Sequence, residues 1–212
     1  MTIMKRIISL LCSLALASAA VFAQTPEEII ARMDEAMQQH DSGSGLAMTM
    51  EMKIFILGTF STDVKSLGDK IRMETNAADK HLITWMDADT EYEYNVGEKV
   101  ITIKHRKANS TSKEEENMKM FKSATAGYDV SLTQETDSAW HFRCRKNKSN
   151  TNKDDPKTMD LVVAKGTYLP VSLSAKVSGI TITMRNLSFD VTEKEVTFDP
   201  AAYPGVTIQD QR

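Results

Sequence analysis

Apolar and polar residues alternate along most of this chain. The segments Met48–Ile54 and Ala139–Arg145 show the pattern clearly, with apolar side chains at every second position. Alternation with a period of two is typical of a β-strand that has one apolar and one solvated face. Because the pattern recurs from residue 46 almost to the end of the chain, it predicts one large, strongly curved antiparallel sheet that could act as a container.

The predicted strands fall into an earlier and a later set. The earlier strands are expected at residues 46–57, 59–66, 69–75, 80–87, 90–95 and 98–105. The later strands are expected at residues 128–135, 138–146, 157–165, 168–177 and 179–191, followed by a short alternating tail from Val196. Turn residues such as Gly68 and Gly166 separate the strands. The strands do not alternate with helices, which excludes a parallel α/β sheet and favours an antiparallel meander.

One amphipathic helix is predicted before the first strand. Thr25 is suited to the N-cap, Pro26 to the first helical position, and Glu28 completes a capping box. An apolar stripe at helical spacing follows, formed by Ile29, Ile30, Met33, Ala36 and Met37. This stripe must lie against an apolar surface, either as ordinary core packing or as a cover over the mouth of a cavity.

A second, shorter helix is predicted between residues 108 and 127, where it interrupts the strands. Ser112 and Glu115 form a second capping box, and Met118 and Phe121 follow at helical spacing. The segment Lys146–Lys157, by contrast, is rich in Lys, Asn, Ser, Thr and Asp, which indicates a long solvated hairpin loop.

The first 23 residues have the pattern of a secretory signal peptide. Lys5 and Arg6 precede the apolar stretch Ile7–Leu16, and small residues then lead to Ala23. The alternative, a retained membrane anchor, requires about 20 apolar residues in a row, and this stretch is shorter. The pattern therefore predicts an exported protein whose mature part, residues 24–212, forms one domain.

The net charge and the cysteine content exclude a nucleic-acid partner and an intramolecular disulfide. The chain has 26 Lys and Arg against 29 Asp and Glu, a net charge of −3. Without Lys5 and Arg6 the net charge is about −5, which makes nucleic acid an unsuitable partner. Cys144 becomes the only cysteine of the mature chain, so no intramolecular disulfide can form. Cys144 follows Trp140 and Phe142 at every second position, so we predict that its side chain is buried on the apolar face of the sheet.

No motif in the sequence indicates catalysis. The four histidines are scattered and lack the spacing of a zinc site. Asp87 and Asp89 fall in a predicted turn between two strands, in a context more typical of a turn than of a calcium loop. We therefore predict no catalytic residue, no metal and no cofactor, and we do not expect the protein to be an enzyme.

The apolar face of the predicted sheet is rich in methionine. Met48, Met50 and Met52 lie on the first strand alone, and thioether side chains adapt to varied partners better than branched ones do. Methionine also fills ordinary cores. A single sheet with two short helices, however, has too little covering surface for its whole apolar face. This favours a concave face that accepts lipid.

The end of the chain resembles that of the LolA family, the periplasmic carriers of outer-membrane lipoproteins. The similarity lies in Val196–Pro200 and Pro204–Arg212, and it extends to Ile71–Glu74 and Asp87–Asn95. The order of the predicted elements also agrees over essentially the whole mature chain. The resemblance implies a mainly β (α+β) fold: an incomplete antiparallel β-barrel of about eleven strands, with the N-terminal helix and the inserted helix as a lid.

The resemblance also implies a function. A family member works in the periplasm as a monomer that shelters the acyl chains of lipoproteins between the inner and outer membranes. Its implied partners are acylated lipoproteins, an inner-membrane ABC transporter and an outer-membrane receptor. Shelter is needed because exposing an acyl chain to water costs about 0.8 kcal/mol per CH₂. For a chain of roughly sixteen carbons this free energy is some 12 kcal/mol. Two alternatives stay open: a lipid-binding envelope sensor or accessory protein of the same fold, and an enzyme that acts on a lipid.

The candidate site combines the resemblance with the alternation. Ile71, Tyr92 and Tyr94 match cavity-lining or aromatic positions of the family, and Met73 shares the face of Ile71. The predicted lipid-binding cavity consists of Met48, Met50, Met52, Ile71, Met73, Trp85, Tyr92, Tyr94, Trp140 and Phe142. The predicted lid residues are Ile30, Met33, Met37, Met118 and Phe121.

The sequence departs from the family at one position. The family has an Arg-Pro pair whose arginine bonds to the lid, and this pair would fall near Leu67-Gly68, where neither residue is present. Arg72 is close in sequence, but it points to the opposite face of the sheet if Ile71 points inward. The contact that latches the family's lid is therefore not expected in its usual form.

Overall fold

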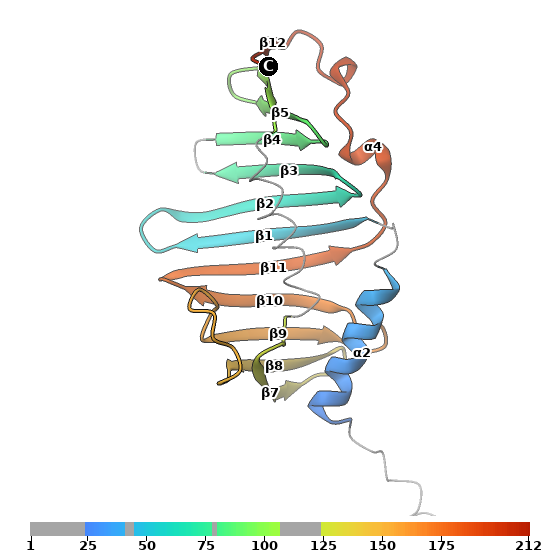
Figure 1. Cartoon of the computed structure of the whole chain (residues 1–212), viewed down its shortest axis with the longest axis vertical. Helices are drawn as coiled ribbons and strands as arrows, with labels where there is room; N and C mark the ends of the chain where they lie inside the picture. Colours follow the sequence, from blue (N-terminus) through green and yellow to red (C-terminus); the bar gives the residue numbers. More distant parts are fainter. Residues whose placement is uncertain (1–23, 41–44, 78–79, 107–123) are drawn as a thin grey trace, which may run out of the picture.

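The computed structural model contains one open sheet of twelve strands (Figure 1). It describes residues 24–40, 45–77, 80–106 and 124–212. The strand order across the sheet is β12-β6-β5-β4-β3-β2-β1-β11-β10-β9-β8-β7. Because β12 and β7 lie at opposite edges and do not pair, the sheet does not close. The mainly β fold with an incomplete antiparallel barrel is thus confirmed.

The chain runs through the sheet as two meanders that meet where β1 pairs with β11. The strands of the first meander are β1 (Leu46–Ile54), β2 (Gly58–Leu67), β3 (Lys70–Ala77), β4 (Lys80–Met86), β5 (Thr90–Asn95) and β6 (Val100–His105). Those of the second are β7 (Tyr128–Glu135), β8 (Ala139–Lys146), β9 (Thr158–Ala164), β10 (Pro170–Val177) and β11 (Ile180–Ser188). These strands agree with the eleven predicted from the alternation.

The C-terminal tail differs from the simple alternating strand that was predicted from Val196. It forms the short helix α4 (Glu193–Val196), a 3-10 turn η1 (Pro200–Ala202) and a twelfth strand, β12 (Thr207–Asp210). β12 runs parallel to β6 and extends the sheet at that edge. The other strand pairs are antiparallel.

The first strand is shorter than predicted. β1 ends at Ile54, which pairs with Gly58, and the three apolar residues 55–57 form the turn into β2. Gly58 has a φ of +91°, a backbone conformation that glycine adopts without steric cost. The run of apolar residues continues past Ile54 without alternating, and the strand ends where the alternation ends.

The N-terminal helix α2 (Pro26–Gln39) begins as predicted. The backbone N–H of Glu28 donates to the Thr25 hydroxyl at 3.2 Å, and the backbone N–H of Thr25 donates to the Glu28 carboxylate at 3.1 Å. This reciprocal capping box leaves fewer unpaired donors in the first turn. The apolar stripe is buried and consists of Ile29, Ile30, Met33 and Met37.

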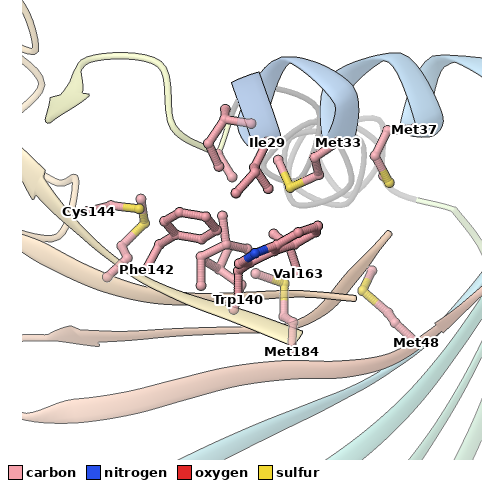
Figure 2. Close-up of a cluster of buried hydrophobic side chains, with 14 residues drawn as sticks. Ile29, Met33, Met37, Met48, Trp140, Phe142, Cys144, Val163 and Met184 are labelled. Atoms are coloured by element: carbon pink, nitrogen blue, oxygen red, sulfur yellow. The ribbon is translucent and has the colours of Figure 1, made fainter. Parts of the chain in front are cut away.

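The main hydrophobic core lies between α2 and one face of the second meander. Figure 2 shows Ile29, Met33 and Met37 pointing from the helix toward the sheet, where Trp140 and Phe142 of β8 face them. Strands β9, β10 and β11 and residue Met48 of β1 complete the cluster. The helix therefore lies across one face of the sheet (Figure 1), and the side chains of that face bury its apolar stripe.

Several predictions concern residues outside the described part of the chain. These are the signal peptide of residues 1–23, the inserted helix and its lid residues Met118 and Phe121. The described residues contain no helix that is long and apolar enough to cross a bilayer.

Candidate functional site

The strand register places the predicted residues of β1 and β3 on one face. Met48 lies opposite Val64 of β2, and Val64 lies opposite Met73 of β3. Directly opposed residues in antiparallel strands point to the same side of a sheet. Met50, Met52 and Ile71 belong to the same side because each is an even number of residues away from a member of this row on its own strand.

The same face continues across the second meander into the core under α2. Met50 is opposite Met184 of β11, and the row proceeds through Leu173 and Leu161 to Phe142 of β8. Trp140 is two residues from Phe142 and points to the same side. The structure therefore brings together seven of the predicted cavity residues: Met48, Met50, Met52, Ile71, Met73, Trp140 and Phe142.

On the same face, apolar side chains continue from the core cluster onto β2, β3 and β4, with Thr62, Thr75 and Thr84 between them. We call these apolar residues the methionine face: Met50, Met52, Val64, Ile71, Met73 and Met86. Ile71 and Met86 are only 5% and 2% exposed, whereas the others are half-buried. The cluster that contains the α2 side chains includes no residue of β3 or β4. Among the described residues, the methionine face thus extends beyond the surface that packs with α2.

The register corrects the predicted grouping of three aromatic residues with these methionines. Trp85 lies opposite Arg72 and Tyr92, and Tyr94 is two residues further along β5. Since Arg72 and Ile71 are adjacent on β3, they point to opposite sides. Trp85, Tyr92 and Tyr94 therefore lie on the reverse face. The expectation that Arg72 points away from Ile71 is met by the same register.

The reverse-face aromatic residues pack against the C-terminal segment. The ring of Phe198 lies 5.4 Å from that of Trp85 and 4.5 Å from that of Tyr92. The ring of Tyr203 lies 5.6 Å from Trp85 and 5.0 Å from Tyr94. These centroid distances are typical of stabilising aromatic pairs. A second, smaller apolar centre thus forms on the face opposite α2.

Ion pairs attach α4 to this reverse face. The Lys65 ammonium lies 2.5 Å from the Glu195 carboxylate, and Lys70 pairs with Glu193. The hydrogen bond from Lys65, together with those from Thr192, lowers the pKa of Glu195 to about 2. A hollow of about 750 Å³ between α4 and the sheet is lined by Lys65, Glu193 and Glu195 and by the rings of Trp85 and Tyr203. The charged side chains make this hollow unsuited to an acyl chain.

The N-terminal helix is held by a contact that the sequence did not reveal. Arg32 of α2 donates to the Tyr168 hydroxyl at 2.8 Å and lies over its ring, 5.2 Å from the centroid. The Tyr168 ring in turn stacks on Trp140 at 5.4 Å. The turn between β9 and β10 therefore joins the helix to the core.

The described residues contain no group of His, Cys, Asp or Glu side chains that could hold a metal ion. Asp87 accepts hydrogen bonds from the backbone N–H groups of Asp89 and Thr90, so it closes a turn as predicted. Cys144 is buried in the core, as predicted, and burial raises the pKa of its thiol to about 11. A thiol of this kind is unreactive at neutral pH.

Solved structures with a similar fold were found. Lipoprotein LppX from Mycobacterium tuberculosis is 11% identical, with a TM-score of 0.52 over 82% of this chain and 100% of that chain. A LolA superfamily protein from Nitrosomonas europaea is 13% identical, with a TM-score of 0.31 over 84% of this chain and 100% of that chain. An outer membrane lipoprotein-sorting protein domain from Vibrio parahaemolyticus is 14% identical, with a TM-score of 0.31 over 79% and 97% of the two chains.

These likenesses concern the fold alone. No family model matches the sequence, and no curated protein sequence is similar to it. The open sheet with its N-terminal helix agrees with the architecture predicted from the sequence, and the likeness to LppX shows that the two chains share a fold.

Proposed function

We propose that this protein binds the acyl chains of lipids on the methionine face and carries acylated lipoproteins through the periplasm. The observation that carries the proposal is the group of half-buried apolar side chains that extends from the core cluster across β1 to β3, with Met50 and Met52 on β1, Val64 on β2 and Met73 on β3. Flexible thioether side chains suit acyl chains that differ in length and unsaturation. The proposed binding residues are those that the register places together, and the reverse-face aromatic residues are not among them.

The helix α2 is the element that would cover the bound acyl chain. Met33 and Met37 contact the same apolar face that supplies Met48 and Met50. An acyl chain that follows the methionine face toward β1 would meet the edge of α2. We infer that α2 covers part of the bound chain, while Tyr168 keeps the helix attached during exchange.

A carrier of this kind would need export and two partners. The signal-like residues 1–23 support export, and the inner-membrane transporter and outer-membrane receptor are proposed from the resemblance to LolA carriers. The methionine face consists of residues of this chain alone. Binding of an acyl chain can therefore be tested without them.

The test is native mass spectrometry with lipid extraction on protein purified from the periplasm of cells that express the full chain. We expect an acylated peptide to co-purify with the unaltered protein. The double variant Met50→Gln and Met73→Gln should lose it. The matched control is Ser61→Gln and Asn76→Gln, which places the same side chain on β2 and β3 but on the reverse face.

Three outcomes separate the possible functions. Loss of the acylated peptide from the methionine variant but not from the control supports the carrier. A free lipid without any peptide favours the envelope sensor. A well-folded protein that is empty, or that loses its lipid equally in both variants, contradicts binding on the methionine face.

A further inference from the structure

The turn between β1 and β2 presents three consecutive apolar side chains to solvent. Phe55, Ile56 and Leu57 are 96%, 88% and 64% exposed. The other large apolar residues that are exposed in the described structure stand singly and are only partly exposed: Leu132, Val171 and Ile208. Isolated residues of that kind are ordinary, whereas three adjacent ones at a tip mark a contact surface.

The tip projects beyond the part of β2 that pairs with β3. Pairing between β2 and β3 begins at Ser61 and Asn76, so Gly58 and Thr59 have no partner in β3. Figure 1 shows the turn between β1 and β2 reaching outward at one end of the strands. The three apolar side chains are therefore accessible to a flat surface that approaches this end of the sheet.

Lysines flank the tip on the same end of the sheet. Lys53 and Lys176 lie on either side of Thr181 in adjacent strands, next to the tip. Further exposed lysines lie in the other turns at this end or at the start of a strand: Lys80, Lys99, Lys148, Lys153 and Lys157. The acidic side chains at this end are fewer: Glu98, Asp129, Asp154 and Asp155. We call this end of the sheet, with its tip and its lysines, the hairpin edge.

The hairpin edge has a charge opposite to that of the chain as a whole, which is negative. An apolar tip surrounded by lysines matches the interface of a bilayer with anionic headgroups, where apolar residues enter the boundary of headgroups and acyl chains. The lysines then meet the lipid phosphates. A second copy of the same edge would instead place lysines against lysines, which is unfavourable.

We propose that the hairpin edge docks on an anionic lipid bilayer through Phe55, Ile56 and Leu57. This goes beyond the proposed carrier function and does not depend on it, since the tip lies outside the methionine face. Docking at this edge would hold the open sheet against the membrane from which a lipid leaves or which it enters.

The test is flotation of the purified protein with phosphatidylglycerol-containing vesicles and with vesicles of pure phosphatidylcholine. The triple variant Phe55→Ser, Ile56→Ser and Leu57→Ser should bind the anionic vesicles at least tenfold more weakly. The control variant Leu132→Ser, Val171→Ser and Ile208→Ser also removes three exposed apolar side chains and should bind as the unaltered protein does.

The lysines are tested separately. The variant Lys53→Gln and Lys176→Gln should bind anionic vesicles about fivefold more weakly for each lysine replaced, with no change on phosphatidylcholine. A Phe55→Trp variant reports insertion directly, because lipids brominated on their acyl chains should quench its new fluorescence. The native Trp85 and Trp140 are buried and serve as the internal reference.

Three results would overturn the proposal. One is that the unaltered protein fails to bind anionic vesicles. Another is that the tip and control variants lose equal affinity. The third is that the unaltered protein sediments as a dimer that the tip variant dissociates, because the tip would then be an interface between two copies.

Discussion

The two ends of the sheet are covered on opposite faces. At the end formed by β7 to β11, aliphatic and thioether side chains pack under α2. At the end formed by β4 to β6, aromatic side chains on the reverse face pack against Phe198 and Tyr203. The sheet therefore has no single core, and the methionine face continues between the two coverings on the α2 side. A carrier could expose that face while both ends of the sheet stay folded.

The two coverings are also held by different forces. The apolar stripe of α2 is buried almost completely, so the hydrophobic effect dominates there. The C-terminal segment combines half-buried rings with the surface ion pairs Lys65–Glu195 and Lys70–Glu193. Exposed ion pairs are weak and are screened by salt. The coverings should therefore respond differently to mutation, salt and pH.

The largest effect is expected from the core under α2. Phe142 is 1% exposed, and Phe142→Ala should lower the free energy of unfolding by about 3–5 kcal/mol. Urea denaturation followed by circular dichroism measures the change. Phe55→Ala, at the exposed hairpin tip, removes the same ring and should change stability by less than about 0.5 kcal/mol. Similar losses for both variants would contradict the placement of the core.

A smaller and more local effect is expected at the aromatic end. Phe198→Ala removes a half-buried ring from Trp85 and Tyr92 and should cost about 2 kcal/mol. Hydrogen exchange should accelerate in residues 193–206 while the amides of α2 stay protected. Equal acceleration in α2 would show that the two coverings form one cooperative unit.

The contact between Tyr168 and Arg32 should contribute less again. Tyr168→Phe keeps the ring on Trp140 but removes the hydroxyl that accepts from Arg32, so we expect a loss of about 1 kcal/mol. Faster hydrogen exchange confined to α2 is the expected signature. Arg32→Lys is the companion variant, because an ammonium cannot reproduce the guanidinium geometry. An unchanged exchange rate in both variants would rule out a role for this contact in holding the helix.

The smallest effect concerns the ion pair of α4 and its dependence on pH. The pKa of Glu195 is lowered to about 2 in the folded protein, from an ordinary value of 4.5. Its stabilising contribution is therefore present above pH 4.5 and is lost as the pH falls toward about 2. Lys65→Gln should raise the Glu195 pKa toward 4.5 in a carboxyl NMR titration. A pKa that stays near 2 in this variant would assign the shift to Thr192 instead.

The strands could be predicted because their alternation is regular. The apolar residues Met48, Met50 and Met52 show which side chains of their strand share a face. The capping box at Thr25 shows where α2 begins. Cys144 could be placed in the core because it continues the row of Trp140 and Phe142. These predictions depend only on residues that are close in the chain.

Which side chains of different strands lie on the same face of the sheet could not be predicted from alternation alone. Alternation shows that Trp85 and Met86 point to opposite sides, but not which of them joins Ile71. That depends on the β3–β4 register, which pairs Ile71 with Met86. The roles of Phe198 and Tyr203 were missed because they contact β4 and β5 only through tertiary packing. Their aromatic character within a short polar tail was the one available signal.

The methionine side chains themselves provide the most direct test of whether an acyl chain binds on the methionine face. The protein is labelled with ¹³C at the methionine methyl groups, and NMR spectra are recorded during titration with a palmitoylated lipopeptide. Assignments come from single Met→Leu variants. Our account predicts that the signals of Met50, Met52 and Met73 shift together and saturate. Binding of the lipopeptide without a shift at these residues would contradict the assignment of the methionine face as the lipid site.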